Sequence, residues 1–399
     1  MTIAPPHRRV IDEDDPVTTE LLIKEARQKS FRRRMRWLFA FVILSSAAAV
    51  TYISTHGTTP SKSVSAASGL HSPTAGTTGA VVSPEHPYQM TVSSNGTLYV
   101  VDVERDQILR RLRSGKFETV AGNGRRGYSG DGGQALDARI NVTTNSGVVV
   151  RNGILYFSDT GNNRVREVLA DGVITTIAGG GSSPLGTKSE PALSVDLRDP
   201  NGVTFGTGGD LYIASGAIYR LEANGTLRWV VGKRGTVPKN WKGVWSSPGV
   251  QWDFLQPSQI AFDSRGDLFD AGGGGGWGLY ERQRTGSLKF LGVYRGDGSA
   301  PSLVESSKGS VLLSCRFGLF WISDAGAVKP TRVSGASLNR ALGHPGDSSQ
   351  HNTFIGGDGL ALSDDGTIYV DTNTGNTFTS VSAILMISPN GHVSALWRS

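Results

Sequence analysis

One short phrase recurs along the chain at a nearly constant interval, and it constrains the fold more than any other feature. It reads Gly-x-Leu-Tyr-x-x-Asp at residues 96–102. With drift, the position of its tyrosine is filled by Tyr99, Tyr156, Tyr212, Phe269, Leu312 and Tyr369, in steps of 57, 56, 57, 43 and 57 residues. A period of this length is typical of propellers and solenoids. The sequence therefore predicts six copies of one small unit.

A second alignment, made without the tyrosines, gives the same interval. Residues 119–122 (Thr-Val-Ala-Gly) match residues 176–179 (Thr-Ile-Ala-Gly), and residues 134–140 match residues 191–197, each pair 57 residues apart. Two separate matches at one spacing support the repeat.

Within one unit the pattern favours four strands. Residues 146–150, 154–157, 165–169 and 173–178 are rich in β-branched or alternating apolar residues, and turns containing Gly, Asn or Asp separate them. No amphipathic helix interrupts this pattern. Six such units in a chain with 53 glycines are typical of a β-propeller, whose radial closure leaves only short strand edges. We therefore predict an all-β, six-bladed β-propeller at residues 85–399.

The chain before the propeller has a different composition. Residues 1–36 end in a basic block with four arginines between 32 and 36, and residues 37–54 form an uncharged run rich in Leu, Phe, Val and Ala. This run is at the short end of what spans a bilayer. Because positive charge stays on the cytoplasmic side, we predict a cytoplasmic tail at 1–36, a transmembrane helix acting as signal anchor at 37–54, and an extracytoplasmic propeller.

A cleaved signal peptide is the alternative interpretation of this segment. Ala47, Ala48 and Ala49 suit a cleavage site, and Arg33 with Arg34 weakly suggests a twin-arginine signal. The 36 residues before the apolar run exceed an ordinary charged n-region, which favours the uncleaved anchor. Residues 55–84, dominated by Ser, Thr, Gly, Ala and Pro, are expected to form a flexible stalk.

Charge and cysteine content limit the range of partners. The formal net charge is +6, but residues 1–36 carry 9 Lys and Arg against 6 Asp and Glu, while residues 85–399 carry 30 against 28. The propeller is thus nearly neutral, and we expect no nucleic-acid partner, which would require a concentrated basic face. The single cysteine, Cys315, cannot form an internal disulfide.

The second unit resembles a known repeat. Residues 159–166 read Asp-Thr-Gly-Asn-Asn-Arg-Val-Arg, between a preceding Leu-Tyr strand and a following Val-Ile-Thr-Thr-Ile-Ala-Gly strand. This pattern is similar to an NHL repeat. The linker at 124–135, with its Gly-Asp-Gly-Gly-x-Ala segment, is similar to the segment between NHL units in bacterial and teneurin-like propellers. The resemblance is specific over residues 87–200 and weakens in units three to six.

The resemblance implies a six-bladed propeller without fixing an activity. NHL-type propellers serve as protein-binding platforms, RNA-binding surfaces, bacterial sensor domains and metal-dependent peptide-amidating lyases, and similar six-bladed folds include gluconolactonases. An activity must therefore be argued from the site.

Strand alternation places several loops on one face of the ring. The turn after the second strand and the linker leaving the fourth strand emerge on the same side. Loops on one face of a rigid scaffold are common recognition sites. The candidate binding residues on this rim are Arg125, Arg126, Tyr128, Asp131, Asp159, Asn162, Asn163, Arg164, Trp241 and Trp245.

Structural roles compete with this interpretation. Asp102, Asp159 and Asp371 close second strands, where a carboxylate commonly accepts hydrogen bonds from nearby amides. Gly161 and Asn162 suit positive φ angles, and Asp131 alone offers too few oxygens for a calcium loop. The tryptophans at 241 and 245 fit either a partner-binding patch or plugs between blades.

Two functional hypotheses follow. The first is a membrane-anchored binding module, sensory or adhesive, that has no catalytic residues, cofactor or metal and meets a protein or glycan at the cell exterior. The alternative is an exported metal-dependent lactonase or lyase, using calcium or zinc held by acidic and Asn ligands that converge on the central channel. No phosphate loop, Gly-x-Ser-x-Gly motif or Cys/His metal spacing is present in the sequence. His86, His344 and His351 fit isolated surface histidines better than a cluster.

Overall fold

The computed structural model describes residues 78–186, 188–231, 257–272, 277–282, 288–294, 302–306, 309–315, 318–322, 328–331, 333, 341, 359–374 and 381–398. The chain divides into two units, Met1–Pro73 and Thr74–Ser399, and every described residue belongs to the second. The expected tail, the anchor at 37–54 and most of the expected stalk lie outside the described residues. Within the described part, no helix has the length and apolar character needed to cross a membrane.

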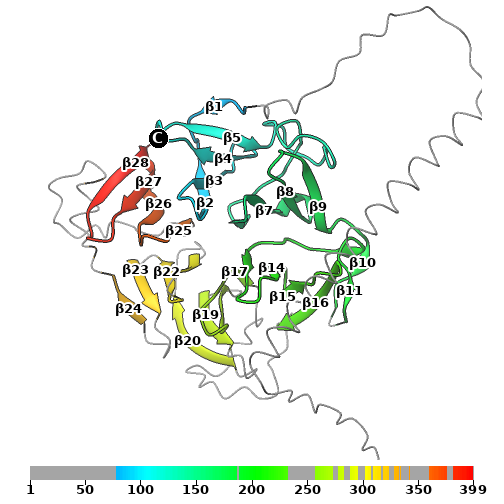
Figure 1. Ribbon diagram of the computed structural model, residues 1–399. Coiled ribbons are helices and arrows are strands. Elements are labelled where there is room, and N and C mark those ends of the chain that lie inside the picture. The colour runs from blue at the N-terminus through cyan, green and yellow to red at the C-terminus, as the bar shows by residue number, and fades with distance from the viewer. Residues whose placement is uncertain are drawn as a thin grey trace, which may run out of the picture. The chain divides into compact units, whose positions relative to one another are not determined.

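Six sheets follow one another along the chain, and each takes its four main strands from one continuous stretch (Figure 1). The first three contain β2 (Pro87–Val92), β3 (Leu98–Asp102), β4 (Gln107–Arg111) and β5 (Phe117–Ala121); β6 (Val148–Arg151), β7 (Ile154–Asp159), β8 (Arg164–Val168) and β9 (Ile174–Gly179); and β13 (Val203–Phe205), β14 (Leu211–Ala214), β15 (Ile218–Leu221) and β16 (Thr226–Val231). The last three contain β17 (Pro257–Phe262), β18 (Leu268–Gly272), β19 (Trp277–Arg282) and β20 (Leu288–Tyr294); β21 (Ser302–Glu305), β22 (Val311–Cys315), β23 (Gly318–Ile322) and β24 (Val328–Pro330); and β25 (Leu360–Leu362), β26 (Ile368–Thr374), β27 (Val381–Ile387) and β28 (Val393–Arg398).

Short strands extend this pattern at the outer edges. They are β1 (Val81–Val82), which pairs with β5; β11 (Glu190–Pro191), which pairs with β16; and the parallel pair β10 (Ser183–Pro184) and β12 (Val195–Asp196). One 3-10 turn, η1 (Thr160–Asn162), follows β7. Because Val81 is already paired with Glu118, the first sheet begins a few residues before the boundary at 85 that composition suggested.

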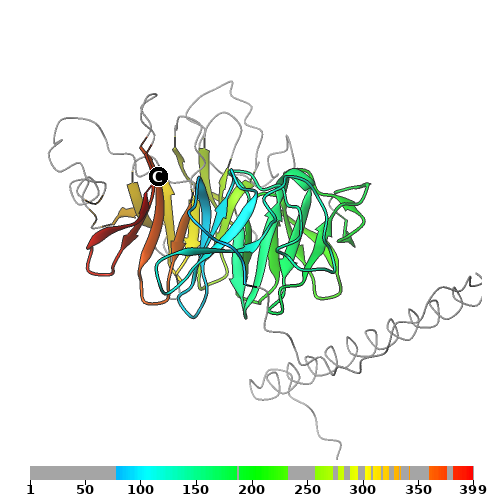
Figure 2. The same ribbon diagram turned by 90° about the horizontal axis from the view of Figure 1, so that it is seen from above.

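The first strands of the six sheets form a closed ring. β2 contacts β6, β6 contacts β13, β13 contacts β17, β17 contacts β21, β21 contacts β25, and β25 returns to β2. Figure 2, turned by 90°, shows the strands running between the two faces of this ring. The predicted six-bladed, all-β propeller is therefore confirmed, and the short fifth unit forms a complete sheet.

Apolar packing between neighbouring sheets holds the ring together. Six clusters of buried apolar residues each join two consecutive sheets, one cluster for each seam. The seam between the first and last sheets contains Val100, Leu109, Ala361 and Ile384, none of which is measurably exposed. Since all strands of the sixth sheet come from the C-terminal end of the chain, this seam closes the ring by side-chain packing rather than by a shared sheet.

The second sheet shows how closely the repeat pattern matches the strands. Strands expected at 154–157 and 173–178 lie at Ile154–Asp159 and Ile174–Gly179. Five pairs of third and fourth strands share one irregularity that the pattern did not predict, because the fourth strand carries one extra residue opposite the third. In the second sheet this residue is Ile177 of β9. Val165 and Arg166 alternate in the ordinary way, and both are buried because both faces of β8 are covered.

Glycines allow adjacent inner strands to approach closely. The N–H of Gly147 donates to the carbonyl of Asn201 at 3.0 Å, and the N–H of Gly202 donates to the carbonyl of Ser258 at 2.7 Å. A Cβ at Gly202 would lie 2.7 Å from that same Ser258 oxygen. Backbone hydrogen bonds thus join the second, third and fourth sheets where a side chain has no room.

Candidate binding site on the rim between the first two sheets

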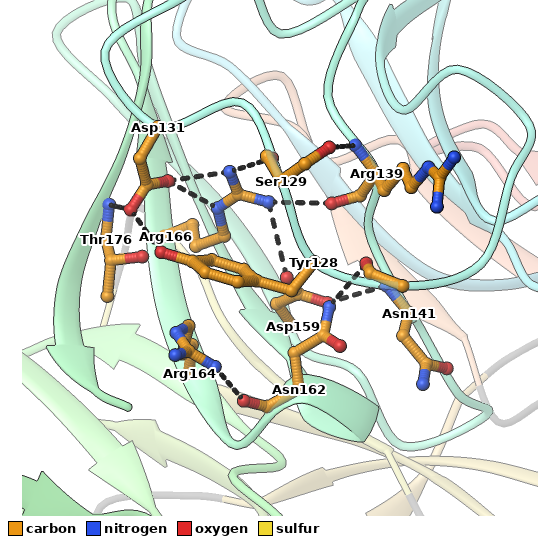
Figure 3. A network of polar contacts seen from close by, with 11 residues as sticks. Tyr128, Ser129, Asp131, Arg139, Asn141, Asp159, Asn162, Arg164, Arg166 and Thr176 are labelled. Carbon is orange, nitrogen blue, oxygen red and sulfur yellow. Dashed lines mark hydrogen bonds and ion pairs between the residues drawn. The ribbon is translucent and has the colours of Figure 1, made fainter. Parts of the chain in front are cut away.

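A fully buried arginine organises the linker that joins the first two sheets (Figure 3). Arg166, on β8, is 0% exposed, and its Nη2 lies 2.6 Å from Oδ1 of Asp131 in the linker. Its Nη1 lies 3.4 Å from Oδ2 of Asp159 at the end of β7. The guanidinium also donates to the carbonyls of Arg139 at 3.0 Å and Ser129 at 2.9 Å. One side chain therefore fixes both ends of the loop at 129–139.

Tyr128 is held between two guanidinium groups. The Cζ atom of Arg164 lies 3.7 Å from the ring centroid, and that of Arg166 lies 5.2 Å from it. The tyrosine hydroxyl donates to Oδ2 of Asp131 at 2.8 Å. A Cβ at Gly180 would lie 2.6 Å from Nε of Arg164, so the glycine leaves space for this stack. Cation–π contacts of this kind add about 0.5–1 kcal/mol each at exposed sites.

Asp159 and Asn162 join the turn after β7 to the linker. The N–H of Asn141 donates to Oδ1 of Asp159 at 2.7 Å, and Nδ2 of Asn162 donates to the same oxygen at 2.8 Å. Nδ2 of Asn162 also donates to the carbonyl of Gly127 at 2.7 Å. The predicted meeting of linker and turn on one face is therefore confirmed.

The two carboxylates differ in proton affinity although both pair with Arg166. Burial tends to raise the pKa of Asp131, but hydrogen bonds from Thr176 and Tyr128 and the charge of Arg166 outweigh it and lower that pKa. Burial dominates at Asp159 and raises its pKa despite hydrogen bonds from Asn162 and Asn141. Asp131 is therefore the firmly ionised partner of Arg166.

Three exposed arginines surround this buried network. Arg125 and Arg139 are exposed, and neither side chain forms an ion pair within the described residues. Arg126 has 62% of its side chain exposed and its Nε lies 3.0 Å from Oδ2 of Asp106. Arg166 offsets the charge of Asp131 and Arg126 offsets that of Asp106, so Arg125 and Arg139 share the outer surface of the linker with one exposed carboxylate, Asp137.

The structure separates the ten sequence-based candidates into four groups. Tyr128, Asp131, Asp159, Asn162 and Arg164 belong to the internal network, whereas Arg125 and Arg126 lie outside it on the same linker. Asn163 closes η1 with φ 55°, and its side-chain oxygen accepts from the N–H of Asp199 at 3.2 Å. Trp241 and Trp245 lie outside the described residues.

One detail of the sequence interpretation needs correction. The positive φ in this turn belongs to Asn163, not to Gly161 or Asn162. Gly161 is needed for a different reason, because a Cβ there would clash with the side chain of Asn141.

The strand-ending carboxylates accept from turn residues, as expected: the backbone N–H of Arg105 donates to Asp102 and Nδ2 of Asn162 donates to Asp159. They also accept from amides that precede the first strand of the sheet, because Glu85 donates to Asp102 and Gly359 donates to Asp371.

Arg166 is the residue that sequence reasoning missed as a site residue. Aligned third strands place it at the position of Leu109, Tyr219 and Leu385, which are all buried. A charged residue at a position that is otherwise apolar was visible in the sequence. Its meeting with Asp131 of the linker and Asp159 of β7 was not.

The centre of the ring is nearly free of charge in its described strands. Arg151 and Glu305, each the last residue of its strand, are the only charged residues in the six innermost strands β2, β6, β13, β17, β21 and β25. Nε2 of Gln89 lies 3.4 Å from Oγ of Ser302, which links the first and fifth sheets. Among the described residues, no three His, Cys, Asp or Glu side chains are grouped so that they could hold a metal ion. Converging acidic ligands are therefore not found in these strands.

Comparisons with known proteins give structural similarity only. No family model matches the chain, and no curated protein does. Virginiamycin B lyase from Staphylococcus aureus is 12% identical, with 78% of this chain and 83% of that chain covered and a TM-score of 0.44. A gluconolactonase from Xanthomonas campestris is 13% identical, with 80% and 87% covered and a TM-score of 0.43. An aldose sugar dehydrogenase from Streptomyces coelicolor is 16% identical, with 78% and 96% covered and a TM-score of 0.45.

The named activities of these proteins correspond to the alternative hypothesis of an enzyme more than to the non-catalytic one. At this identity and these TM-scores the similarity carries no argument about activity. In particular, no family model supports the resemblance to NHL repeats.

Proposed function

We propose that this protein is a membrane-anchored, extracytoplasmic NHL-type propeller that binds a partner through the rim between its first two sheets. The observation that carries this proposal is the rigid linker at 124–139, which Arg166 fixes from inside while Arg125, Arg126 and Arg139 stay exposed. Recognition loops on rigid scaffolds bind with little ordering cost.

The chemistry of the rim favours an anionic partner. Arg125 and Arg139 have no carboxylate partner among the described residues, and the nearby Asp131 already neutralises Arg166. Arginine is well suited to carboxylate, sulfate or phosphate groups because its donors form a fixed fork. We therefore expect a protein or glycan at the cell exterior with clustered acidic groups, and binding that weakens with added salt.

Site-directed photo-crosslinking on the full-length protein in whole cells tests this proposal. A photo-reactive residue at position 125 is expected to capture a macromolecule from the cell exterior, and the same residue at position 94, in the β2–β3 turn on the opposite face, is expected to capture none. Capture from position 94 alone would place the binding surface elsewhere.

The membrane anchor is a separate part of the proposal. Protease added to intact cells is expected to remove residues 85–399 and spare residues 1–36, because the basic block at 32–36 keeps the tail inside. Recovery of a soluble chain that begins near residue 50 would instead show cleavage.

The second candidate function is an exported metal-dependent lactonase or lyase, the kind of activity named for two of the similar structures. Calcium or zinc retained by protein purified without chelators, together with turnover of a lactone, would decide in its favour.

A further inference from the structure

Asp270 is a buried acid in the seam between the third and fourth sheets. It is 3% exposed, and among the described residues neither Oδ1 nor Oδ2 has a hydrogen-bond partner. On β18 it shares a face with Leu268, which packs against Ala214 and Ile218 of the third sheet. Ionising a carboxyl group in such apolar surroundings is costly.

The other five sheets show that this position does not require a polar group. The residues one step after the aligned tyrosine position are Val100, Phe157, Ile213, Leu313 and Val370, and all are 0% exposed. The acid in the fourth sheet is therefore a departure from the repeat that lowers the stability of the seam.

The opposite seam of the fourth sheet carries a second group of acids. Nη2 of Arg265 lies 2.8 Å from Asp263, 3.0 Å from Asp267 and 3.8 Å from Glu281. These three carboxylates are at most 9% exposed. Glu305, on β21 of the fifth sheet, shares a face with Leu303, which packs in this same seam.

In each seam the surroundings of one acid, Glu305 or Asp270, favour its protonated form. Burial, together with the negative charge of Asp263, raises the pKa of Glu305 to about 7. Burial alone raises the pKa of Asp270 well above its usual range. Three titratable or charged residues lie on the Asp270 side. Tyr212 on β14 forms a hydrogen bond with Arg220. Arg282 and Tyr280 are on β19, where Tyr280 pairs with Asp270 and has its side chain outside the described part.

We propose that the fourth sheet is a pH-sensitive element of the ring, whose packing against its two neighbours loosens when the carboxyls in its seams ionise. All four strands of this sheet are consecutive in the chain, and no other strand of the described residues joins it. The fourth sheet is therefore held by side-chain packing in its two seams and by backbone contacts at their inner edge. Each seam contains a carboxyl group that is stable there only when protonated.

The direction of the effect follows from the raised pKa of each acid. The folded state binds the Glu305 proton more tightly than the unfolded chain, whose glutamate has its ordinary value of 4.5. The stabilisation is therefore complete below 4.5 and is lost as pH rises through about 7. Asp270 acts in the same direction, because its pKa is also raised. The rim between the first two sheets is separate from this element, so the inference does not depend on the proposed function.

Hydrogen exchange and thermal unfolding of the full-length protein between pH 5 and 8 test the proposal. We expect the melting temperature to fall across this range and exchange at 257–272 to accelerate at the higher pH, while exchange at 148–179 stays slow. Glu305→Gln should flatten the fall near pH 7. Asp270→Val, which restores the residue type of the other sheets, should raise the melting temperature more at pH 8 than at pH 5.

Glu222→Gln is the matched control, because Glu222 is a carboxylate of the third sheet whose pKa is lowered by Arg220. It should leave the fall near pH 7 unchanged. The proposal is overturned if Glu305→Gln and Asp270→Val both keep the wild-type pH dependence, or if protection is lost equally in the second and fourth sheets.

Discussion

The guanidinium of Arg166 and the carboxylate of Asp131 lie 2.6 Å apart and join a strand of the second sheet to the linker that leaves the first. The arginine is completely buried, whereas 29% of the aspartate side chain is exposed. This pair fixes the position of the exposed part of the linker. The function proposed for the rim therefore depends on an arginine that is out of a partner's reach.

Replacing Arg166 with leucine is expected to destabilise the protein by about 3–5 kcal/mol, although leucine occupies the aligned positions 109 and 385. The change leaves Asp159 buried without its cation and frees two backbone carbonyls. Arg228→Ala, which removes a largely exposed ion pair with Glu222, should cost less than about 1 kcal/mol. Urea unfolding of the three proteins gives the comparison, and an Arg166→Leu loss as small as that of the control would contradict a structural role for the network.

Gly202→Ala is expected to destabilise the ring by more than about 1 kcal/mol, the cost of overpacking that shifts the backbone. Its Cβ would lie 2.7 Å from the carbonyl oxygen of Ser258 in the next sheet. Gly186→Ala is the matched control, since nothing lies within 4 Å of a Cβ there and its φ is not in the left-handed region. Equal melting temperatures for the two variants would show that the inner strands can separate without cost.

Deleting residues 360–399 is expected to unfold or aggregate the remaining chain. The sixth sheet covers Val100 and Leu109 of the first sheet on one side and Leu312 of the fifth on the other. Removing it exposes apolar surface in two seams to water, which costs about 25 cal/mol of free energy per Å². Size-exclusion chromatography and circular dichroism of the truncated protein are the measurements, and a monomer with unchanged melting would show that the five remaining sheets are independently stable.

The repeat made most of the architecture predictable, because each unit obeys the same local rules. The tyrosine spacing located all six second strands, including the short fifth unit, before any contact was known. The site was less accessible from the sequence. Arg166 and Asp270 are charged residues at positions where the aligned units have apolar ones, and comparing the units would have revealed both.

Other features of the site depend on geometry that no residue pattern encodes. Strand alternation turns Val165 towards the third sheet and Arg166 towards the first, but no residue pattern places the linker that meets the arginine. Tyr128 was predicted as an exposed binding residue of the rim; it is 42% exposed, but its ring also lies between Arg164 and Arg166 and its hydroxyl donates to Asp131. Substituting it would therefore confuse a loss of binding with a loss of structure.

Binding at the rim is tested by the affinity of the full-length protein for its captured partner, measured with Arg125→Ala and Arg139→Ala combined. Both side chains are exposed and lie outside the buried network, so the melting temperature should not change. If each arginine contributes about 1–2 kcal/mol, affinity should fall about 30- to 1,000-fold. Arg113→Ala with Lys116→Ala removes two exposed cations from the β4–β5 turn on the opposite face and should leave affinity unchanged. Unchanged affinity of the rim variant, or an equal loss of affinity in the control, would contradict binding at the rim.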